Sequence, residues 1–285
     1  MNIGIRLHDT ARGTLSERLG FAKDQGFSCV QLAMSKAIQG FSMQDAPQLL
    51  TEALAEEVKD IFAQKQMECA VLGCYLNLAN PDDEEVKKTQ EIYRAHLRFA
   101  RMIGARVVGS ETYAAKACSF SDGKAYDSEE AFQLFMKNFL PVVRFAEEEN
   151  AVIAIEPVCT HVISTPERAE RMLDIVHTDH VQIILDAVNL LNNDNCGSAE
   201  AIFANAISRL GDRVRVLHMK DFERNTEKPG DAQVDFRPCG MGTMYYGQIL
   251  PFAKKYDLPI SLEDTSPENA QAAREFLEAK AASFI

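Results

Sequence analysis

The sequence predicts a single (β/α)8 barrel formed by residues 1–285. Short apolar segments with strand character alternate with longer amphipathic segments, which is typical of βαβ units and a parallel sheet. Eight such pairs follow one another along the chain, and at about 36 residues each they suit a closed barrel. No linker, low-complexity segment or break in composition divides the chain.

The expected strands are short and rich in branched aliphatic residues. Continuous apolar segments such as VQIIL at 181–185 are typical of strands that are buried on both faces of a parallel sheet. A doubly wound open sheet is the main alternative, but it usually has a Gly-rich turn after its first strand, and LHDT at 7–10 has no glycine. The eight strands are expected at 2–7, 27–32, 68–74, 105–108, 152–155, 181–185, 214–217 and 259–262.

The expected helices follow the strands and repeat apolar residues at helical spacing. Thr165-Pro166 and Ser266-Pro267 each place a hydroxyl cap before a proline, which favours a helix start, and Ser128 is a weaker start of this kind. The helices are expected at 15–24, 49–65, 84–103, 129–149, 166–176, 199–210, 246–256 and 267–282. The segments 33–46, 111–127 and 222–244 are long loops after strands, which in a barrel lie on the catalytic face.

The composition excludes several classes of partner and site. Lys plus Arg total 30 and Asp plus Glu total 42, so the formal net charge is −12. Because Lys and Arg dominate affinity for phosphate backbones, we expect no nucleic-acid partner. The seven cysteines include no C-x-x-C pair, which argues against a disulfide framework or a thiolate zinc site. With no signal-peptide core and no apolar segment of membrane-spanning length, we expect a cytoplasmic protein without membrane association.

A residue that can bind metal ends each of the last four predicted strands. Glu156, Asp186, His218 and Glu263 follow VIAI, QIIL, VRVL and PISL. Since the carboxyl ends of neighbouring strands converge at one mouth of a barrel, these side chains are expected to face one point. Three carboxylates buried together would be costly without a cation. The set predicts a divalent metal site, where oxygen-rich ligation with one imidazole favours Mn²⁺ or Mg²⁺ and leaves Zn²⁺ open.

These four residues resemble the ligand set of the xylose-isomerase-like sugar isomerases and epimerases, a superfamily that includes tagatose and psicose 3-epimerases and hydroxypyruvate isomerases. The resemblance covers essentially the whole chain and is sharpest from residue 152 to residue 265. It implies a manganese site in which magnesium or cobalt can substitute. It also implies that Glu156 and Glu263 act as acid and base on opposite faces of the substrate. Relatives are often dimers or tetramers, so a homo-oligomer is expected.

The resemblance extends to three further positions. Arg224 stands six residues after His218, at the offset of the family's substrate-binding arginine. The segment CGMG at 239–242 resembles the family's Gly-x-Gly turn. Asn189 departs from the epimerases, which usually have a substrate-binding histidine three residues after the aspartate. An amide can still bond a substrate hydroxyl but carries no charge, so the substrate class stays open at this position.

Other candidates for substrate contact lie at strand ends or in the following loops. Lys220 either orients the substrate or forms an ion pair with Asp221 at the rim. Glu111 either contacts the substrate or forms a loop salt bridge, and His161 either contacts it or caps the next helix. The aromatic candidates either stack on an apolar sugar face or serve in packing. The full set of these candidates is Lys220, Glu111, His161, Tyr75 and Phe236, with Arg6 and His8 as further residues that can line the mouth.

The chemistry expected from this set is proton transfer on a small sugar or sugar derivative. A hard cation stabilises the enediolate that forms when one glutamate removes the proton next to a carbonyl. Return of a proton by the other glutamate inverts the carbon or moves the carbonyl. A lyase that dehydrates a keto-sugar or keto-inositol is the main alternative. Less favoured are a non-catalytic carbohydrate-binding barrel, which needs no pair of bases, and an abasic-site endonuclease-like hydrolase, whose zinc cluster needs histidines that are misplaced here.

Overall fold

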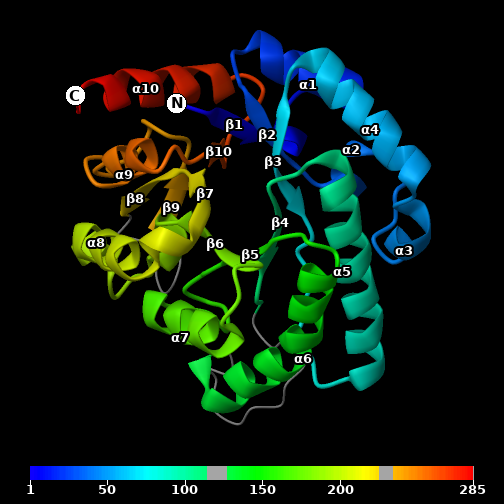
Figure 1. Cartoon of the computed structure of the whole chain (residues 1–285). Coiled ribbons are helices and arrows are strands. Elements are labelled where there is room, and N and C mark those ends of the chain that lie inside the picture. The colour runs from blue at the N-terminus through cyan, green and yellow to red at the C-terminus, as the bar shows by residue number, and fades with distance from the viewer. Residues whose placement is uncertain (114–126, 225–233, 285) are drawn as a thin grey trace.

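The computed structural model describes residues 1–113, 127–224 and 234–284. Its barrel strands are β1 (Ile3–Arg6), β2 (Cys29–Leu32), β3 (Glu68–Gly73), β4 (Val107–Glu111), β5 (Ile153–Glu156), β6 (Val181–Asp186), β7 (Val214–Met219) and β10 (Ile260–Leu262). These eight strands are parallel and close in chain order, because β10 pairs with β1. Figure 1 shows the helices on the outside of this barrel, with both chain ends beside the last helix. The predicted (β/α)8 barrel is confirmed.

The helices begin where the sequence supplies caps. Thr14 and Glu17 form a capping box before the first helix, Ser128 caps the sixth, and Thr165 with Pro166 starts the seventh as predicted. The helices are α1 (Leu15–Asp24), α2 (Met34–Ala37), α3 (Ala46–Leu49), α4 (Glu52–Lys65), α5 (Asp83–Ile103), α6 (Glu129–Glu148), α7 (Pro166–Val176), α8 (Ala199–Leu210), α9 (Ile249–Lys255) and α10 (Ala270–Ala282).

Three predicted helix boundaries are wrong. The helix expected at 49–65 is interrupted between α3 and α4, because the Thr51 hydroxyl accepts from the backbone of Leu54 and begins a new helix. The expected start at Ser266-Pro267 lies three residues early. There the Asn269 side chain accepts from the backbone N–H of Ser266, which holds the intervening residues in a turn before α10. The helix expected from residue 246 begins at Ile249.

The long segment 222–244 contains an antiparallel hairpin that the sequence did not predict. Strand β8 (Asp221–Arg224) pairs with β9 (Val234–Arg237). Each strand has four residues, two or three of them charged, so neither has the apolar periodicity that marks a strand. Of the other long loops, 33–46 contains α2, whereas most of 111–127 lies outside the described residues.

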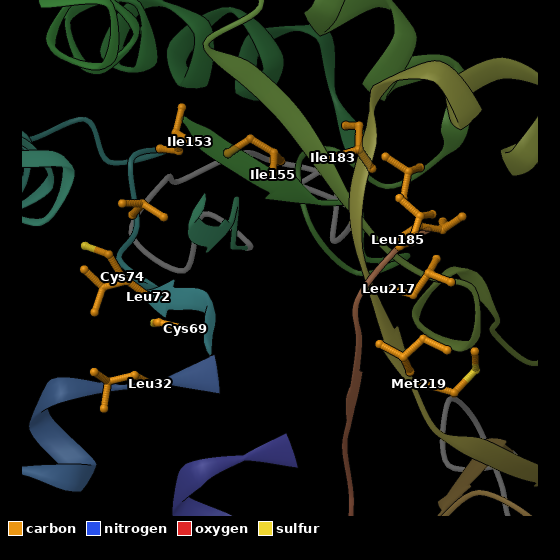
Figure 2. Close-up of a cluster of buried hydrophobic side chains, with 14 of the residues drawn as sticks. Leu32, Cys69, Leu72, Cys74, Ile153, Ile155, Ile183, Leu185, Leu217 and Met219 are labelled. Carbon is orange, nitrogen blue, oxygen red and sulfur yellow. The ribbon is translucent and has the colours of Figure 1, made fainter. Parts of the chain in front are cut away.

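Alternation along the strands decides which side chains face the inside of the barrel. On β5, Ile153 and Ile155 belong to the large core between strands and helices, part of which is drawn in Figure 2. Ala154 belongs to a separate interior cluster, which consists of Cys29, Ala70, Val71, Val107, Ala154, Ile184 and Val216. Glu156 therefore faces the inside of the barrel, two residues beyond Ala154. The same parity places Asp186 and His218 inside, beyond Ile184 and Val216.

Two further observations concern the chain as a whole. The six cysteines among the described residues are free thiols, and Cys118 lies outside those residues. Within the described ranges, no helix combines the length and the apolar character needed to cross a bilayer.

Candidate active site

Glu156, His218 and Glu263 meet at the carboxyl mouth of the barrel. The Nδ1 atom of His218 lies 3.0 Å from Oε2 of Glu156 and 3.1 Å from Oε1 of Glu263. One potential ligand atom from each residue lies within 4.8 Å of the other two. All three residues are buried. Three of the four predicted ligand residues thus converge on one point.

Asp186, the fourth predicted ligand, is paired with a lysine. Its Oδ2 lies 2.8 Å from Nζ of Lys220, and its Oδ1 accepts from the backbone N–H groups of Val188 and Asn189 at 2.9 and 3.2 Å. The same ammonium lies 3.1 Å from Oε2 of Glu263. Lys220 therefore bridges Asp186 and Glu263 instead of pairing with its neighbour Asp221.

The buried carboxylate of Asp221 accepts several hydrogen bonds from the loop that follows β9. The donors are the backbone N–H groups of Gly240 and Met244 at 3.1 and 2.9 Å and the hydroxyl of Tyr246 at 2.9 Å. A side chain at Gly242 would collide with this carboxylate. The CGMG turn thus needs glycine at 242 because the turn closes directly over Asp221.

The ionisable groups at the mouth form one coupled network. Burial alone would lower the pKa of His218, but Glu156 and Glu263 outweigh it and raise this pKa to about 9. Burial alone would raise the pKa of Glu263, but His218 and Lys220 outweigh it and lower this pKa well below its ordinary value. Burial raises the pKa of Asp186, and Lys220 opposes part of that rise. Neighbouring charges thus outweigh burial for His218 and Glu263, whereas burial prevails for Asp186.

The donor atoms fit a divalent cation. Nδ1 of His218 and Oδ2 of Asp186 have the ion-pair partners given above, but Nε2 of His218 is buried and has no partner among the described residues. Buried polar atoms are rarely left in this state, so a further partner is indicated. An imidazole nitrogen and two carboxylate oxygens directed at a shared point are ordinary ligands for Mg²⁺, Mn²⁺ or Zn²⁺. Glu156, His218 and Glu263 would hold such an ion, with Asp186 as a candidate fourth ligand.

Two predicted substrate contacts touch the site residues themselves. Nδ2 of Asn189 donates to Oε1 of Glu156 at 2.6 Å, and both residues are buried. The ring centroid of Phe236, on β9, lies 4.6 Å from Nζ of Lys220. Asn189 therefore orients a glutamate, and Phe236 covers the buried ammonium with the face of its ring.

Glu111 and His161 lie next to each other on the neighbouring side of the mouth. Glu111 ends β4 beside Glu156, and its Oε2 lies 3.7 Å from Nδ1 of His161, too far for a hydrogen bond. Burial, Glu156 and Glu263 raise the pKa of Glu111 to about 8. Burial lowers the pKa of His161 to about 4. Burial thus disfavours the charged form of both groups.

A cavity of about 320 Å³ opens beside Glu263 on the side of β1 to β4. Tyr75 lines it, and its predicted stacking on a sugar face stays a prediction. Gln31 also lines it, although it is not among the residues predicted from the sequence. Its signal was present, because Gln31 is the one polar residue in the apolar segment CVQL and stands two residues after the interior Cys29. The polar lining consists of Arg6, His8, Gln31, Tyr75, Glu111 and Glu263, together with side chains of the following loops.

Arg224 lies away from the carboxylates. It is exposed at the end of β8 and lines a different cavity, of about 510 Å³, near the start of α8. No described contact joins Arg224 to Glu156, His218 or Glu263. Its predicted contact with the substrate stays a prediction.

Comparison with protein families gives one match over most of the chain. The family model described as xylose isomerase-like TIM barrel matches residues 19–280. Among curated proteins, D-psicose 3-epimerase from Enterocloster bolteae is 23% identical over 167 residues, which are 58% of this chain and 52% of that protein. The matched part thus spans about half the length of this relative.

Solved structures resemble the chain over nearly its full length. The crystal structure of a D-tagatose 3-epimerase-like protein has a TM-score of 0.76 at 16% identity, covering 100% of this chain and 98% of that one. The structure of the IolI protein with bound zinc has a TM-score of 0.70 at 17% identity, covering 99% and 96%. At such low identity, these similarities show the fold alone.

Proposed function

Since the chain belongs to the xylose isomerase-like TIM barrel family, we propose that it is a divalent-metal-dependent isomerase or epimerase of a small sugar or sugar derivative. The observation that carries the proposal is the placement of two buried carboxylates, Glu156 and Glu263, within 3.1 Å of one His218 nitrogen. The match to a psicose epimerase supports this class of reaction. A pair of carboxyl groups in one pocket can remove a proton and return another.

Glu156, His218 and Glu263 are the residues that we propose to hold the cation, with Asp186 as fourth ligand. When bound, the ion supplies a Lewis acid that polarises the substrate carbonyl. We propose Mn²⁺, on the family resemblance and the oxygen-rich donor set, with Mg²⁺, Co²⁺ and Zn²⁺ as alternatives.

The two glutamates take different parts in the proposed proton transfer. Glu263 is held ionised by His218 and Lys220, so it is ready to accept the proton next to the carbonyl. Glu156 is oriented by the hydrogen bond from Asn189 and faces the same space. Return of a proton to the other face of the same carbon gives an epimer, and return to the neighbouring carbon gives an isomer.

A deuterium exchange experiment tests this proposal. Free ketoses are incubated with the protein in D₂O, with and without Mn²⁺, and the C–H signals are followed by NMR. We expect cation-dependent loss of one C–H signal together with the signals of a new isomer or epimer. A product that has lost water would instead indicate the lyase. Binding of a sugar without exchange would contradict the proposal and indicate a carbohydrate-binding barrel.

The proposal also covers the cellular compartment, the partner and the oligomeric state of the enzyme. Six described cysteines are free thiols, which supports a reducing compartment, and we place the enzyme in the cytoplasm. Its partner is a small-molecule sugar. We propose a homo-oligomer, a dimer or a tetramer, on the family resemblance.

A further inference from the structure

Gln31 and Tyr75 form a hydrogen-bonded pair in the wall of the cavity beside Glu263. Gln31 is 3% exposed, and its Nε2 donates to the hydroxyl of Tyr75 at 3.0 Å. Its Oε1 is buried and has no hydrogen-bond partner within residues 1–113, 127–224 and 234–284. Since buried polar atoms are almost always bonded, this oxygen indicates a partner that is not among the described residues, and a ligand in the cavity can supply it.

Tyr75 is fitted closely into the mouth of the barrel by two glycines. A Cβ atom at Gly73 would lie 3.0 Å from the Tyr75 ring, and one at Gly109 would lie 3.2 Å from its hydroxyl. Burial raises the pKa of Tyr75 well above 10, and Glu156 adds to the rise, so the hydroxyl keeps its proton. Because the hydroxyl oxygen accepts from Gln31, its own hydrogen is free to point to a second acceptor.

The pair therefore presents one acceptor, Oε1 of Gln31, and one donor, the hydroxyl of Tyr75. A sugar hydroxyl donates one hydrogen bond and accepts others, so it complements both atoms. Phosphate and carboxylate oxygens only accept, so they would leave Oε1 facing lone pairs. The hydrogen-bonding pattern favours a neutral hydroxyl group.

The charges around the cavity favour a neutral group as well. Arg6 is already engaged, with Nε 2.8 Å from Asp9 and Nη1 3.6 Å from Glu263. Burial, Lys36 and Arg6 lower the pKa of His8 to about 4, so His8 is neutral at pH 7. Lys36 is then the cation of the lining that has no ion pair among the described residues. An anion would therefore find one uncommitted cation in this lining, an ammonium that is exposed to solvent.

We propose that this cavity binds the uncharged, hydroxylated end of the substrate, and that Gln31, together with Tyr75, determines specificity by bonding a hydroxyl there. The substrate class is thus a free keto-sugar with hydroxyl groups beyond the reacting carbons, and a sugar phosphate is disfavoured. This inference rests on the proposed function for the position of the reacting carbons, but its binding claim requires no turnover.

The test compares three ligands by ligand-observed NMR titration with Mg²⁺ present: D-fructose, D-fructose 6-phosphate and dihydroxyacetone, which lacks the distal hydroxyls. Wild type is expected to bind D-fructose more tightly than the other two. Gln31→Met should weaken D-fructose binding about tenfold, in keeping with one lost hydrogen bond in a buried site. Gln31→Met should leave dihydroxyacetone binding unchanged. Tyr75→Phe should likewise weaken D-fructose binding and leave dihydroxyacetone binding unchanged.

Gln182→Met is the matched control. Gln182 is also a buried glutamine of a barrel strand, but its amide donates to the backbone of Asp179 at 2.7 Å, away from the cavity. This variant should leave the ratio of D-fructose to dihydroxyacetone affinity unchanged. General structural damage would weaken binding of both ligands, so the ratio separates damage from lost recognition.

Three results would overturn the inference: an unchanged affinity ratio in Gln31→Met and Tyr75→Phe, tighter binding of the 6-phosphate than of the free sugar, or no binding of D-fructose. These results are distinct from failure of the proposed function. Selective binding of D-fructose without C–H exchange would contradict the proposed reaction but support the binding subsite. C–H exchange together with an unchanged ratio of D-fructose to dihydroxyacetone affinity in the variants would contradict the subsite but support the reaction.

Discussion

The ammonium of Lys220 lies 2.8 Å from the carboxylate of Asp186, and both residues are buried inside the barrel. Lys220 offsets one of the three carboxylates at the site. Glu156, Asp186 and Glu263 contribute three negative charges and Lys220 contributes one positive charge, so with His218 neutral the sum is −2. One divalent ion would balance that sum.

Removal of Lys220 should leave Asp186 buried without a counter-charge. Lys220→Met is expected to lower the free energy of unfolding by about 3–5 kcal/mol in urea titrations of the metal-free protein. The double variant Lys220→Met/Asp186→Asn should recover most of this loss, because it removes the stranded charge as well. If the double variant were no more stable than the single one, the pair would not be the source of the loss.

Each proposed acid/base residue can be made neutral at nearly constant shape. Glu156→Gln and Glu263→Gln are expected to keep the circular dichroism spectrum of wild type and to lower the rate of C–H exchange by about 10²–10⁴-fold. Glu148→Gln, on the exposed surface of α6, is the control and should exchange at the wild-type rate. Near-normal exchange in either site variant would contradict the assigned roles.

Cation affinity should rise with pH. The pKa of His218 is raised to about 9 in the cation-free site, so at pH 7 the ring carries a proton that a bound cation must displace. Affinity is expected to increase up to about tenfold per pH unit between pH 6 and 8 and to level off above the pKa. Calorimetry in buffers of different ionisation enthalpy should show release of about one proton per ion at pH 7. Proton uptake, or an affinity independent of pH, would argue against His218 as a ligand.

Acid should destabilise the fold through His96. Burial lowers the pKa of this ring to about 4, whereas an unfolded chain has the ordinary value near 6.5. The unfolded state therefore binds more protons, so stability is complete above about pH 6.5 and is lost as the pH falls. Between pH 7 and 5, wild type should lose roughly 2 kcal/mol more than His96→Leu in urea titrations. Parallel losses in the two proteins would assign the acid sensitivity to other groups.

The barrel and the three residues that meet at its mouth could be predicted because both depend on patterns within single strands. An apolar segment that ends in a charged residue marks the mouth of a barrel, and Glu156, His218 and Glu263 each follow such a segment. The contact of Asp186 with Lys220 could not be predicted in this way. It depends on which strands become neighbours when the barrel closes, and β6 and β7 bring these two side chains together.

The errors have local causes. Thr51 and Asn269 form side-chain hydrogen bonds that move helix starts by a few residues, and helical periodicity does not register such bonds. Gln31 was missed because a single polar residue in an apolar strand resembles an edge or packing position. Its parity with Cys29 would have placed it inside the barrel.

Cation binding by the purified protein tests the central claim most directly. Isothermal titration with Mn²⁺, together with elemental analysis, should give one ion per chain for wild type. His218→Leu, which removes the nitrogen between the two glutamates, should show no binding over the same concentration range. If wild type bound no divalent ion, or if His218→Leu bound one equally well, the proposed metal site and its chemistry would be wrong.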